Sequence, residues 1–434
     1  MKKIYTIVLM FIVQCLMFNV QCFSQTAPAI QWQKCYGGTN GEGARSIQQT
    51  TDGGYIVAGP TLSNDGDVAL NHGNKDYWVI KLDSLGNLQW EKTYGGTGYD
   101  DPFDIQQTAD GGYVVAGWSA SNDGDVTGNH NSSDYWIVKI DSSGIIQWEK
   151  SLGGSQIDEA FKIAQTNNKG YIVVGISESI DGDVTGNHGG WDSWVLKLDS
   201  LGNLEWQKSY GGSSTEAMQS VVQTNDGGYI ATGYTWSNDG NVTANFGNAD
   251  YWTIKLDSSG NLQWQKSFGG SSSELALAVL QSTDGNYEIG GWSESNNGNV
   301  TGNHGTEDYW VIKLDSSSNI QWEKSLGGSN ADVFFSMQHT QTHGFIIAGY
   351  TTSNDSDVSG NHSVSPITDC WIVELDSLSN LLWQKCLGGT LDDKAHSIQQ
   401  TIDEGYIVAG NTNSNDGDVS GNHGGGDFWI IKLA

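Results

Sequence analysis

Short runs of alternating apolar and polar residues recur along the chain, separated by turns rich in glycine, aspartate and serine. One copy contains four such runs, at residues 104–108, 113–117, 135–140 and 146–150. Asp-Gly-Gly joins the first two runs and Asp-Ser-Ser-Gly the last two, and glycine there supplies the positive φ of a tight hairpin. No run has the 3.6-residue period of a helix. The copy therefore predicts a four-stranded antiparallel sheet.

Two tryptophan series show that this unit occurs seven times. The first series marks the third strand: Trp78, Trp136, Trp194, Trp252, Trp310, Trp371 and Trp429. The second marks the fourth strand: Trp32, Trp90, Trp148, Trp206, Trp264, Trp322 and Trp383. In both series, subtracting successive positions gives five intervals of 58 residues and one of 61. Seven four-stranded units predict a β-propeller with tryptophans packed between adjacent blades.

The two ends of the repeat array are complementary. The array begins with a fourth-type strand at 30–36 and stops in a third-type strand at 427–433. Pairing of these two strands completes the seventh blade and leaves no open edge in the ring. We therefore predict an all-β, seven-bladed propeller over residues 26–434, closed by the N-terminal outer strand.

The first 25 residues have a different pattern. Two lysines precede a mostly apolar run at 4–20, and Ser-Gln-Thr follows at 24–26. This order predicts a secretory signal peptide at 1–25. Gln14 and Asn19 interrupt the apolar run before the ~20 residues that a membrane span needs. The mature chain is expected to have no membrane span and to be secreted or at the cell surface, with the periplasm as an alternative.

The charge balance of the chain argues against several classes of function. The chain has 50 acidic and 20 basic residues, a formal charge of −30 and one arginine, Arg45. This balance argues against nucleic-acid and anionic-membrane partners and against sialidases, which need an arginine triad. Neither a Gly-x-Ser-x-Gly nor a His-Glu-x-x-His motif is present. We expect a monomeric, non-enzymatic binding module, with a polysaccharide hydrolase or lyase using long-loop carboxylates as the alternative.

Two motifs carry a family resemblance. Thr-Asp-Gly-Gly-Tyr-Ile-Val-Ala-Gly at Thr51–Gly59 and Asp-Tyr-Trp-Val-Ile-Lys-Leu-Asp at Asp76–Asp83 recur in the blades. Their strand register resembles WD-repeat propellers, and the motifs resemble secreted bacterial propellers of the delta-60 type. The resemblance covers nearly all of the mature chain. It implies a fold and a location, and it implies no activity.

The long loop between the second and third strands carries an EF-hand-like spacing of oxygen ligands. In three copies, positions one, three and twelve are aspartate, position five is threonine or serine and position six is glycine. The candidate calcium ligands are Asp123, Asp125, Thr127, Asp134, Asp181, Asp183, Thr185, Asp192, Asp416, Asp418, Ser420 and Asp427. The alternative is that these loops form Asx turns without a metal.

Acidic residues and histidines also recur once per blade. An acid stands four residues after each Gly-Gly pair, and a histidine in the long loop of six blades, with Phe246 in the remaining one. A metal or acid–base site is one interpretation. Hydrogen-bonded struts between loops are the other, because scaffold roles recur in every blade whereas catalytic machinery rarely does.

Positions at which the blades disagree favour ligand binding. The residue after the second-strand glycine varies from Pro60 to Trp118, and aromatics out of register occur nearby. The candidate ligand-binding set is Trp118, Tyr234, Trp236, Trp292 and Tyr350. Sugar rings stack on aromatic faces, so a glycan or a surface protein is the expected partner. The alternative interpretation is that these residues pack between adjacent blades.

Three cysteines follow the predicted signal segment. If Leu375 pairs with Leu381 across the hairpin, Cys370 lies opposite Cys386. A cross-strand disulfide between these two is then possible in an exported protein, and it leaves Cys35 without a partner.

Overall fold

The alternating runs form strands, and each group of four pairs as one antiparallel sheet, so the predicted all-β propeller is confirmed. The computed structural model describes residues 26–362 and 365–434; the predicted signal segment, 1–25, lies outside the described residues. The strands of the first four blades are β2 Ser46–Gln49, β3 Tyr55–Thr61, β4 Asp76–Leu82, β5 Leu88–Tyr94; β6 Asp100–Gln107, β7 Tyr113–Ser119, β8 Asp134–Ile140, β9 Ile146–Leu152; β10 Asp158–Gln165, β11 Tyr171–Ser177, β12 Asp192–Leu198, β13 Leu204–Tyr210; β14 Glu216–Gln223, β15 Tyr229–Thr235, β16 Asp250–Leu256, β17 Leu262–Phe268.

The remaining strands complete blades 5, 6 and 7. They are β18 Glu274–Gln281, β19 Tyr287–Ser293, β20 Asp308–Leu314, β21 Ile320–Leu326; β22 Asp332–His339, β23 Phe345–Thr351, β24 Asp369–Leu375, β25 Leu381–Leu387; β26 Asp393–Gln400, β27 Tyr406–Thr412, β28 Asp427–Leu433, β1 Ile30–Tyr36. Within the described residues no helix is long and apolar enough to span a bilayer.

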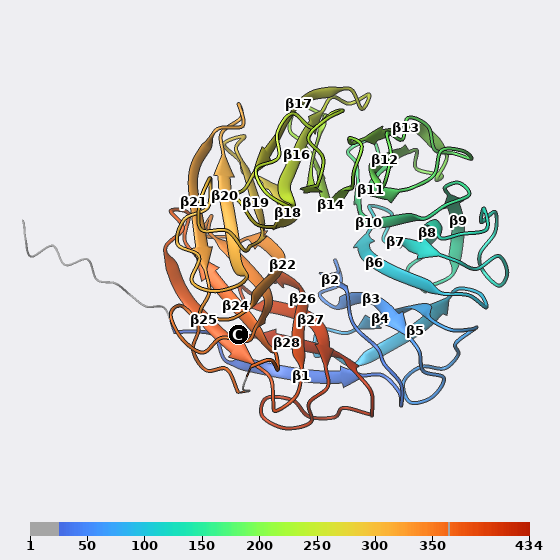
Figure 1. Ribbon diagram of the computed structural model, residues 1–434. Coiled ribbons are helices and arrows are strands. Elements are labelled where there is room, and N and C mark those ends of the chain that lie inside the picture. The colour runs from blue at the N-terminus through green and yellow to red at the C-terminus, as the bar shows by residue number, and fades with distance from the viewer. Residues whose placement is uncertain (1–25, 363–364) are drawn as a thin grey trace, which may run out of the picture.

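The two ends of the chain close the ring as predicted. Strand β1 pairs antiparallel with β28, with Cys35 opposite Trp429 and Tyr36 opposite Phe428. The seventh blade therefore has the order β1-β28-β27-β26. Figure 1 shows β1 and β28 side by side in one blade, with the innermost strands of the blades arranged around the centre of the ring.

The core lies between blades rather than inside them. The third-strand tryptophans are at most 1% exposed, and each packs on an aromatic residue or a strand of the preceding blade. The Tyr135 hydroxyl donates to the main-chain carbonyl of Trp194 in the next blade at 3.0 Å, and their ring centroids are 4.7 Å apart. Fourth-strand tryptophans pack on the first residue of the second strand of the following blade, as Trp148 of β9 does on Tyr171 of β11. The predicted structural role of the tryptophans is confirmed.

A β-bulge in the innermost strand directs one residue toward the channel. In blade 2 the register with β7 shifts between Pro102 and Asp104, which leaves Phe103 without a cross-strand partner. Strands β10, β14, β18, β22 and β26 have the same shift. The bulge needs glycine on the neighbouring strand, because a Cβ on Gly117 would lie 2.1 Å from the carbonyl oxygen of Asp101.

The predicted register of the cysteine hairpin is wrong by one residue. A bulge between Glu374 and Leu375 shifts the pairing, so Cys370 lies opposite Leu387 and Cys386 opposite Trp371. Side chains alternate between the faces of a strand, so the two thiols project to opposite sides of the blade. They belong to different core clusters, and all three cysteines are free thiols in the structure.

Candidate functional site

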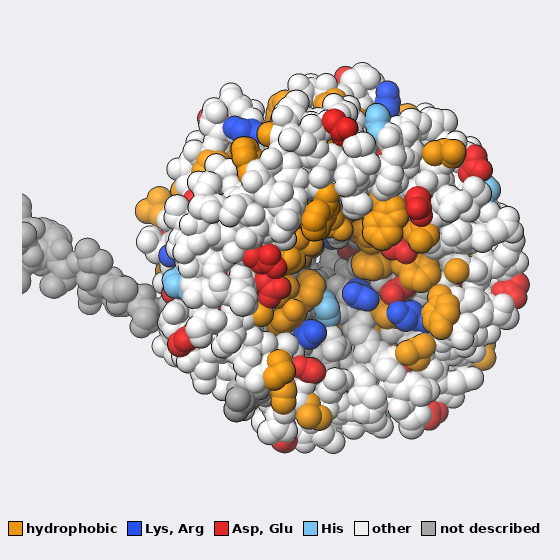
Figure 2. Space-filling view, in the orientation of Figure 1, with side chains coloured by type: hydrophobic (Ala, Val, Ile, Leu, Met, Phe, Trp, Pro, Cys, Tyr) orange, Lys and Arg blue, Asp and Glu red, His pale blue; other side chains and the backbone are white. Residues whose placement is uncertain are grey.

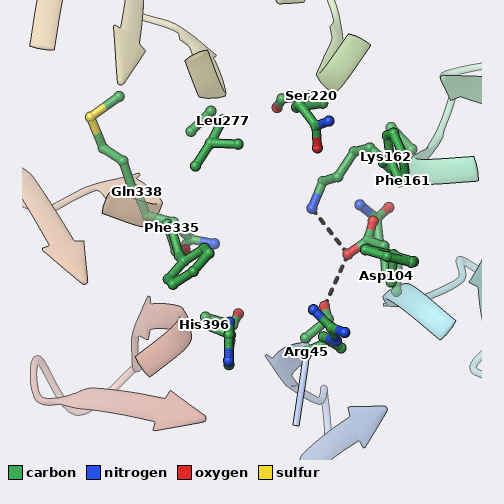
Figure 3. A pocket seen from close by; sticks show the side chains of 18 of the residues that line it. Arg45, Asp104, Phe161, Lys162, Ser220, Leu277, Phe335, Gln338 and His396 are labelled. Atoms are coloured by element: carbon green, nitrogen blue, oxygen red, sulfur yellow. Dashed lines mark hydrogen bonds and ion pairs between the residues drawn. The ribbon is translucent and has the colours of Figure 1, made fainter. Parts of the chain in front are cut away.

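The bulged residues line a pocket of about 580 Å³ in the central channel. One residue comes from each blade: Arg45, which directly precedes the short strand β2, and then Phe103, Phe161, Gln219, Leu277, Phe335 and His396. Figure 3 shows Arg45, Asp104 and Lys162 on one side of this pocket and Leu277, Phe335 and Gln338 on the other. The buried positions repeat from blade to blade, whereas these seven differ in size and charge.

The mouth of the channel lies at the long-loop end of the same strands. There each variable second-strand residue lies opposite a variable first-strand residue, for example Trp118 opposite Asp101. In blades 4 to 6 the pairs are Ala217 with Tyr234, Leu275 with Trp292 and Val333 with Tyr350. Ala217 and Val333 are buried, and we call the half-buried Tyr234, Leu275, Trp292 and Tyr350 the apolar half of the mouth.

The other blades supply ionic groups at this level. Asp101, Glu159 and Lys394 occupy the equivalent first-strand positions of blades 2, 3 and 7. With Arg45 and Lys75 they form what we call the charged half of the mouth. Figure 2 shows orange, blue and red side chains gathered around the central opening, in contrast to the largely white surface around them.

The structure brings together three of the five aromatics predicted to bind ligand. Tyr234, Trp292 and Tyr350 occupy equivalent positions in consecutive blades and are half-buried. Trp118 lies in the charged half. Trp236 lies beyond the end of β15, with 48% of its surface exposed. Their role in binding stays a prediction.

Most cations of the chain are repeated scaffold residues, and the exceptions gather at the mouth. Outside the lysine series of Lys34 and Lys81 and the two N-terminal lysines, the chain has five cations: Arg45, Lys75, Lys162, Lys169 and Lys394. Four of them reach the channel or its mouth. Lys75 binds Asp101 at 2.9 Å, and Lys162 binds Asp104 at 3.0 Å. A net-acidic protein thus concentrates its non-repeated positive charges at one opening.

Two carboxyl groups in the charged half differ in environment. Burial, aided by the negative charge of Asp101, raises the pKa of Glu159 to about 7. Asp101 itself is ion-paired with Lys75 and lies 3.8 Å from the guanidinium of Arg45. A carboxyl group of raised pKa next to a second carboxyl group is an arrangement used in general acid–base catalysis.

His396 is held in its neutral form. Burial, with the charges of Arg45 and Lys394, lowers its pKa to about 3. Its Nε2 lies 2.9 Å from Oδ1 of Asn411, so Nε2 carries the hydrogen and donates it. The ring packs on Phe335 with centroids 4.6 Å apart.

Each residue predicted to bind calcium makes at least one hydrogen bond within the protein. Asp123 accepts from the main-chain N of Thr97 at 2.7 Å, and Asp125 accepts from that of Gly95 at 3.3 Å. The other candidates have equivalent partners: main-chain amides for Asp181, Asp183, Asp416 and Asp418, fourth-strand side chains for Thr127, Thr185 and Ser420, and loop histidines for Asp134, Asp192 and Asp427. Within 26–362 and 365–434, no three His, Cys, Asp or Glu side chains converge on one metal position.

Calcium in these loops stays a proposal with a direct test. It predicts that adding Ca²⁺ to EDTA-treated protein gives a saturable rise in melting temperature, because binding to the folded state alone stabilises it. Mg²⁺ at the same concentration serves as the control. A flat response at millimolar Ca²⁺ contradicts the proposal and leaves the loops held by their own hydrogen bonds.

Each junction between blades buries two carboxyl groups. At the junction of blades 2 and 3, Asp158 accepts from the main-chain N of Gly154 and the hydroxyl of Ser179, both at 2.8 Å. Asp134 accepts from His130 through Oδ2, and its buried Oδ1 has no hydrogen-bond partner among the described residues. The seven pairs are Glu42 with Asp427, Asp100 with Asp76, Asp158 with Asp134, Glu216 with Asp192, Glu274 with Asp250, Asp332 with Asp308 and Asp393 with Asp369. The acids after Gly-Gly are struts, as predicted, but the histidines bind the other member of six of the pairs, and Asp250 of the seventh accepts from the main-chain N of Phe246.

Comparisons with known proteins show the fold and no family. No family model matches the chain. Among curated proteins, the regulatory protein FlaEY of Caulobacter vibrioides is 28% identical over 202 residues, which is 43% of this chain. The chain spans 21% of the length of that relative. Among solved structures, the WD40 β-propeller domain of Doa1 matches with a TM-score of 0.52, 8% identity and coverage of 94% of this chain and 97% of that one. The WD40 domain of Neurospora crassa Pan2 matches with a TM-score of 0.49, 10% identity and coverage of 90% and 88%.

Proposed function

We propose that the chain is an exported, non-enzymatic binding module that takes a glycan or a surface protein at the mouth of its central channel. One observation carries this proposal: the residues that differ between blades meet at that mouth, while the scaffold residues repeat. Function in propellers resides on loops and strand ends held by a rigid ring, so a non-repeated set at one opening favours a ligand site there.

The division of the mouth supports a ligand with both apolar and polar groups. The half-buried rings of Tyr234, Trp292 and Tyr350 offer apolar faces at little cost in side-chain entropy. The charged half places cations and carboxyls across the opening. Pockets of about 300–1,000 Å³ with apolar walls and a few directed polar groups are typical of binding sites, and the channel pocket of about 580 Å³ lies in this range.

Removing two rings of the apolar half tests the proposal. We expect Trp292→Ala with Tyr350→Ala to weaken binding to any ligand found on glycan and peptide arrays by about tenfold or more. Phe246→Ala, which removes an exposed aromatic of a long loop outside the mouth, is the matched control. Binding unchanged in the double variant, with an unchanged melting temperature, places the ligand elsewhere on the ring.

The environments of Asp101 and Glu159 favour a second candidate, a hydrolase or lyase acting on polysaccharide. In that role Glu159 is the proton donor and Asp101 the ionised partner, both at the mouth of the channel. Incubation with a panel of polysaccharides separates the two candidates. Product formation that is lost in Glu159→Gln supports the enzyme, and binding without turnover supports the module.

A further inference from the structure

Two cations at the mouth have room for a further partner. Arg45 is 33% exposed, makes one ion pair of 3.8 Å and, among the described residues, donates no side-chain hydrogen bond. Lys394 has no carboxylate within 4.0 Å in the described part of the chain; its Nζ lies 4.7 Å from the ring centroid of Tyr350. Lys75 and Lys162, in contrast, are each paired with an aspartate.

The chain segments that carry these two cations are neighbours at the junction of blades 7 and 1, and both charges act on His396. The guanidinium of Arg45 also lies 5.0 Å from the ring centroid of Phe103. The main-chain N of Ala44 donates to the carbonyl of Gly410, which places Arg45 beside Asn411. Lys394 lies opposite Asn411 across the strands, and His396 donates to the side-chain oxygen of the same residue. Arg45, Lys394 and His396 therefore surround one asparagine on the channel wall. Figure 3 shows Arg45 and His396 next to each other at the pocket edge.

We infer that Arg45 and Lys394 form a carboxylate-binding site at the channel mouth, suited to the free C-terminal carboxylate of an extended polypeptide with apolar last residues. This inference rests on the proposed binding function and names the ligand. The planar guanidinium of Arg45 matches a carboxylate with two parallel hydrogen bonds, and Lys394 adds a second charge.

The charges around the site favour a single negative charge. Asp101 and Asp104 lie on the neighbouring blade, and both are already neutralised by lysines. A polyanion would extend over these acids and over a surface with a formal charge of −30. A ligand with a single carboxylate can bind Arg45 and Lys394 without extending over these acids.

The surroundings favour a peptide over an acidic sugar. Phe335 packs on His396, and Leu277 lies further along the same wall of the pocket. Leu275, which is half-buried, belongs to the apolar half of the mouth. Such side chains receive apolar residues but leave sugar hydroxyls without hydrogen bonds, which is costly. The pocket volume admits a few residues of an extended chain rather than a folded surface.

Paired peptide arrays test this site. Each random octapeptide is presented once as a free acid and once as the C-terminal amide, and oligogalacturonate is the acidic-sugar probe. We expect binders to carry apolar last residues and to lose about tenfold or more in affinity on amidation. Arg45→Gln and Lys394→Gln should cause a similar loss, and Arg45→Lys a smaller one. Lys169→Asn is the control; it removes an exposed cation of the β10–β11 turn, at the end of the strands opposite the mouth, at a positive φ that asparagine tolerates.

The outcomes separate this site from the proposed function. Equal binding of acids and amides overturns the carboxylate site, and sensitivity of that binding to Trp292→Ala then retains the proposed module. Binding of oligogalacturonate that depends on Arg45, without peptide binding, overturns the peptide assignment. Absence of any peptide binding by protein with a native melting temperature overturns the inference as well.

Discussion

Replacing Gly233 by alanine is expected to lower the free energy of unfolding by about 3 kcal/mol. A Cβ at this position would lie 1.7 Å from the carbonyl oxygen of Ala217, an atom of the main chain that cannot rotate away. The two strands must separate to admit the methyl group, which breaks hydrogen bonds next to the bulge of blade 4. Chemical denaturation followed by tryptophan fluorescence measures the change.

Gly41→Ala is the matched control for this substitution. The nearest atom to a Cβ on Gly41 is a methyl carbon of Leu62 at 3.9 Å, an ordinary contact, and its φ is not in the left-handed region. We expect its stability to stay within about 0.5 kcal/mol of the wild type. Equal stability of the two variants would show that the strands at Gly233 tolerate a wider spacing, and that the glycine is not needed for the bulge.

The second large effect is a rise in stability as the pH falls from 8 to about 4.5. Burial, followed by the negative charge of Glu274, raises the pKa of Asp250 to about 7, and burial raises that of Asp332 to about 7. In the unfolded chain both carboxyls titrate near 3.9. The folded protein therefore holds protons over this range that the unfolded chain has released, so stability is greatest below the range and is lost as the pH rises through 7. Asp250 alone contributes on the order of 3 kcal/mol.

Other carboxyls set the acid limit of this trend. Hydrogen bonds and an ion pair with a buried lysine lower the pKa values of Asp52, Asp110 and Asp226 to about 2, despite the opposing effect of their partial burial. Their contribution is present above the unfolded pKa and is lost as the pH falls below about 4. The melting temperature is thus expected to pass through a maximum between pH 4 and 6.

Asp250→Asn identifies the group responsible. Within residues 26–362 and 365–434, the buried Oδ1 of Asp250 has no hydrogen-bond partner. Oδ1 of Asp250 and Oε2 of Glu274 each lie 2.3 Å from the position that a Cβ on Gly269 would take. The amide of Asn at position 250 donates to Glu274 at every pH, whereas the wild-type acid does so only when it is protonated. We therefore expect the melting temperature of Asp250→Asn to exceed that of the wild type at pH 8 and to differ little from it at pH 5. Glu294→Gln, at an exposed position, is the control. An unchanged pH slope in Asp250→Asn would assign the effect to other junctions.

Features that repeat could be predicted from the sequence. The strand periods, the glycine turns and the tryptophan intervals each recur seven times, so an error in one copy is corrected by the others. The ring closure followed from the same logic, because the unpaired strands at 30–36 and 427–433 need each other. The residues after the second-strand glycine were recognised as a candidate site because they break the repeat.

Features that depend on bulges could not be predicted. One extra residue in a strand leaves the apolar alternation intact on either side, so the bulge at Phe103 and the shift before Leu375 have no clear signal. The shift before Leu375 places the Cys386 side chain on the opposite face of the blade from the one predicted. Because the bulge at Phe103 was not predicted, the residues that line the channel were not recognised. An alignment of the repeats nevertheless shows that this position differs from blade to blade: Arg45, Phe103, Phe161, Gln219, Leu277, Phe335 and His396.

The seam between β1 and β28 also determines when the site comes into existence during synthesis. Arg45 belongs to the first complete blade, and Lys394 and His396 to the last one, which needs β28 and β1 to form. Arg45 and Lys394 of the carboxylate-binding site are separated by about 350 residues of chain, and the segments that carry them become neighbours only after β28 has been made. A chain that lacks β28 keeps the blades already completed but has no assembled carboxylate-binding site. Ligand binding at this site is therefore restricted to chains in which β28 has been made.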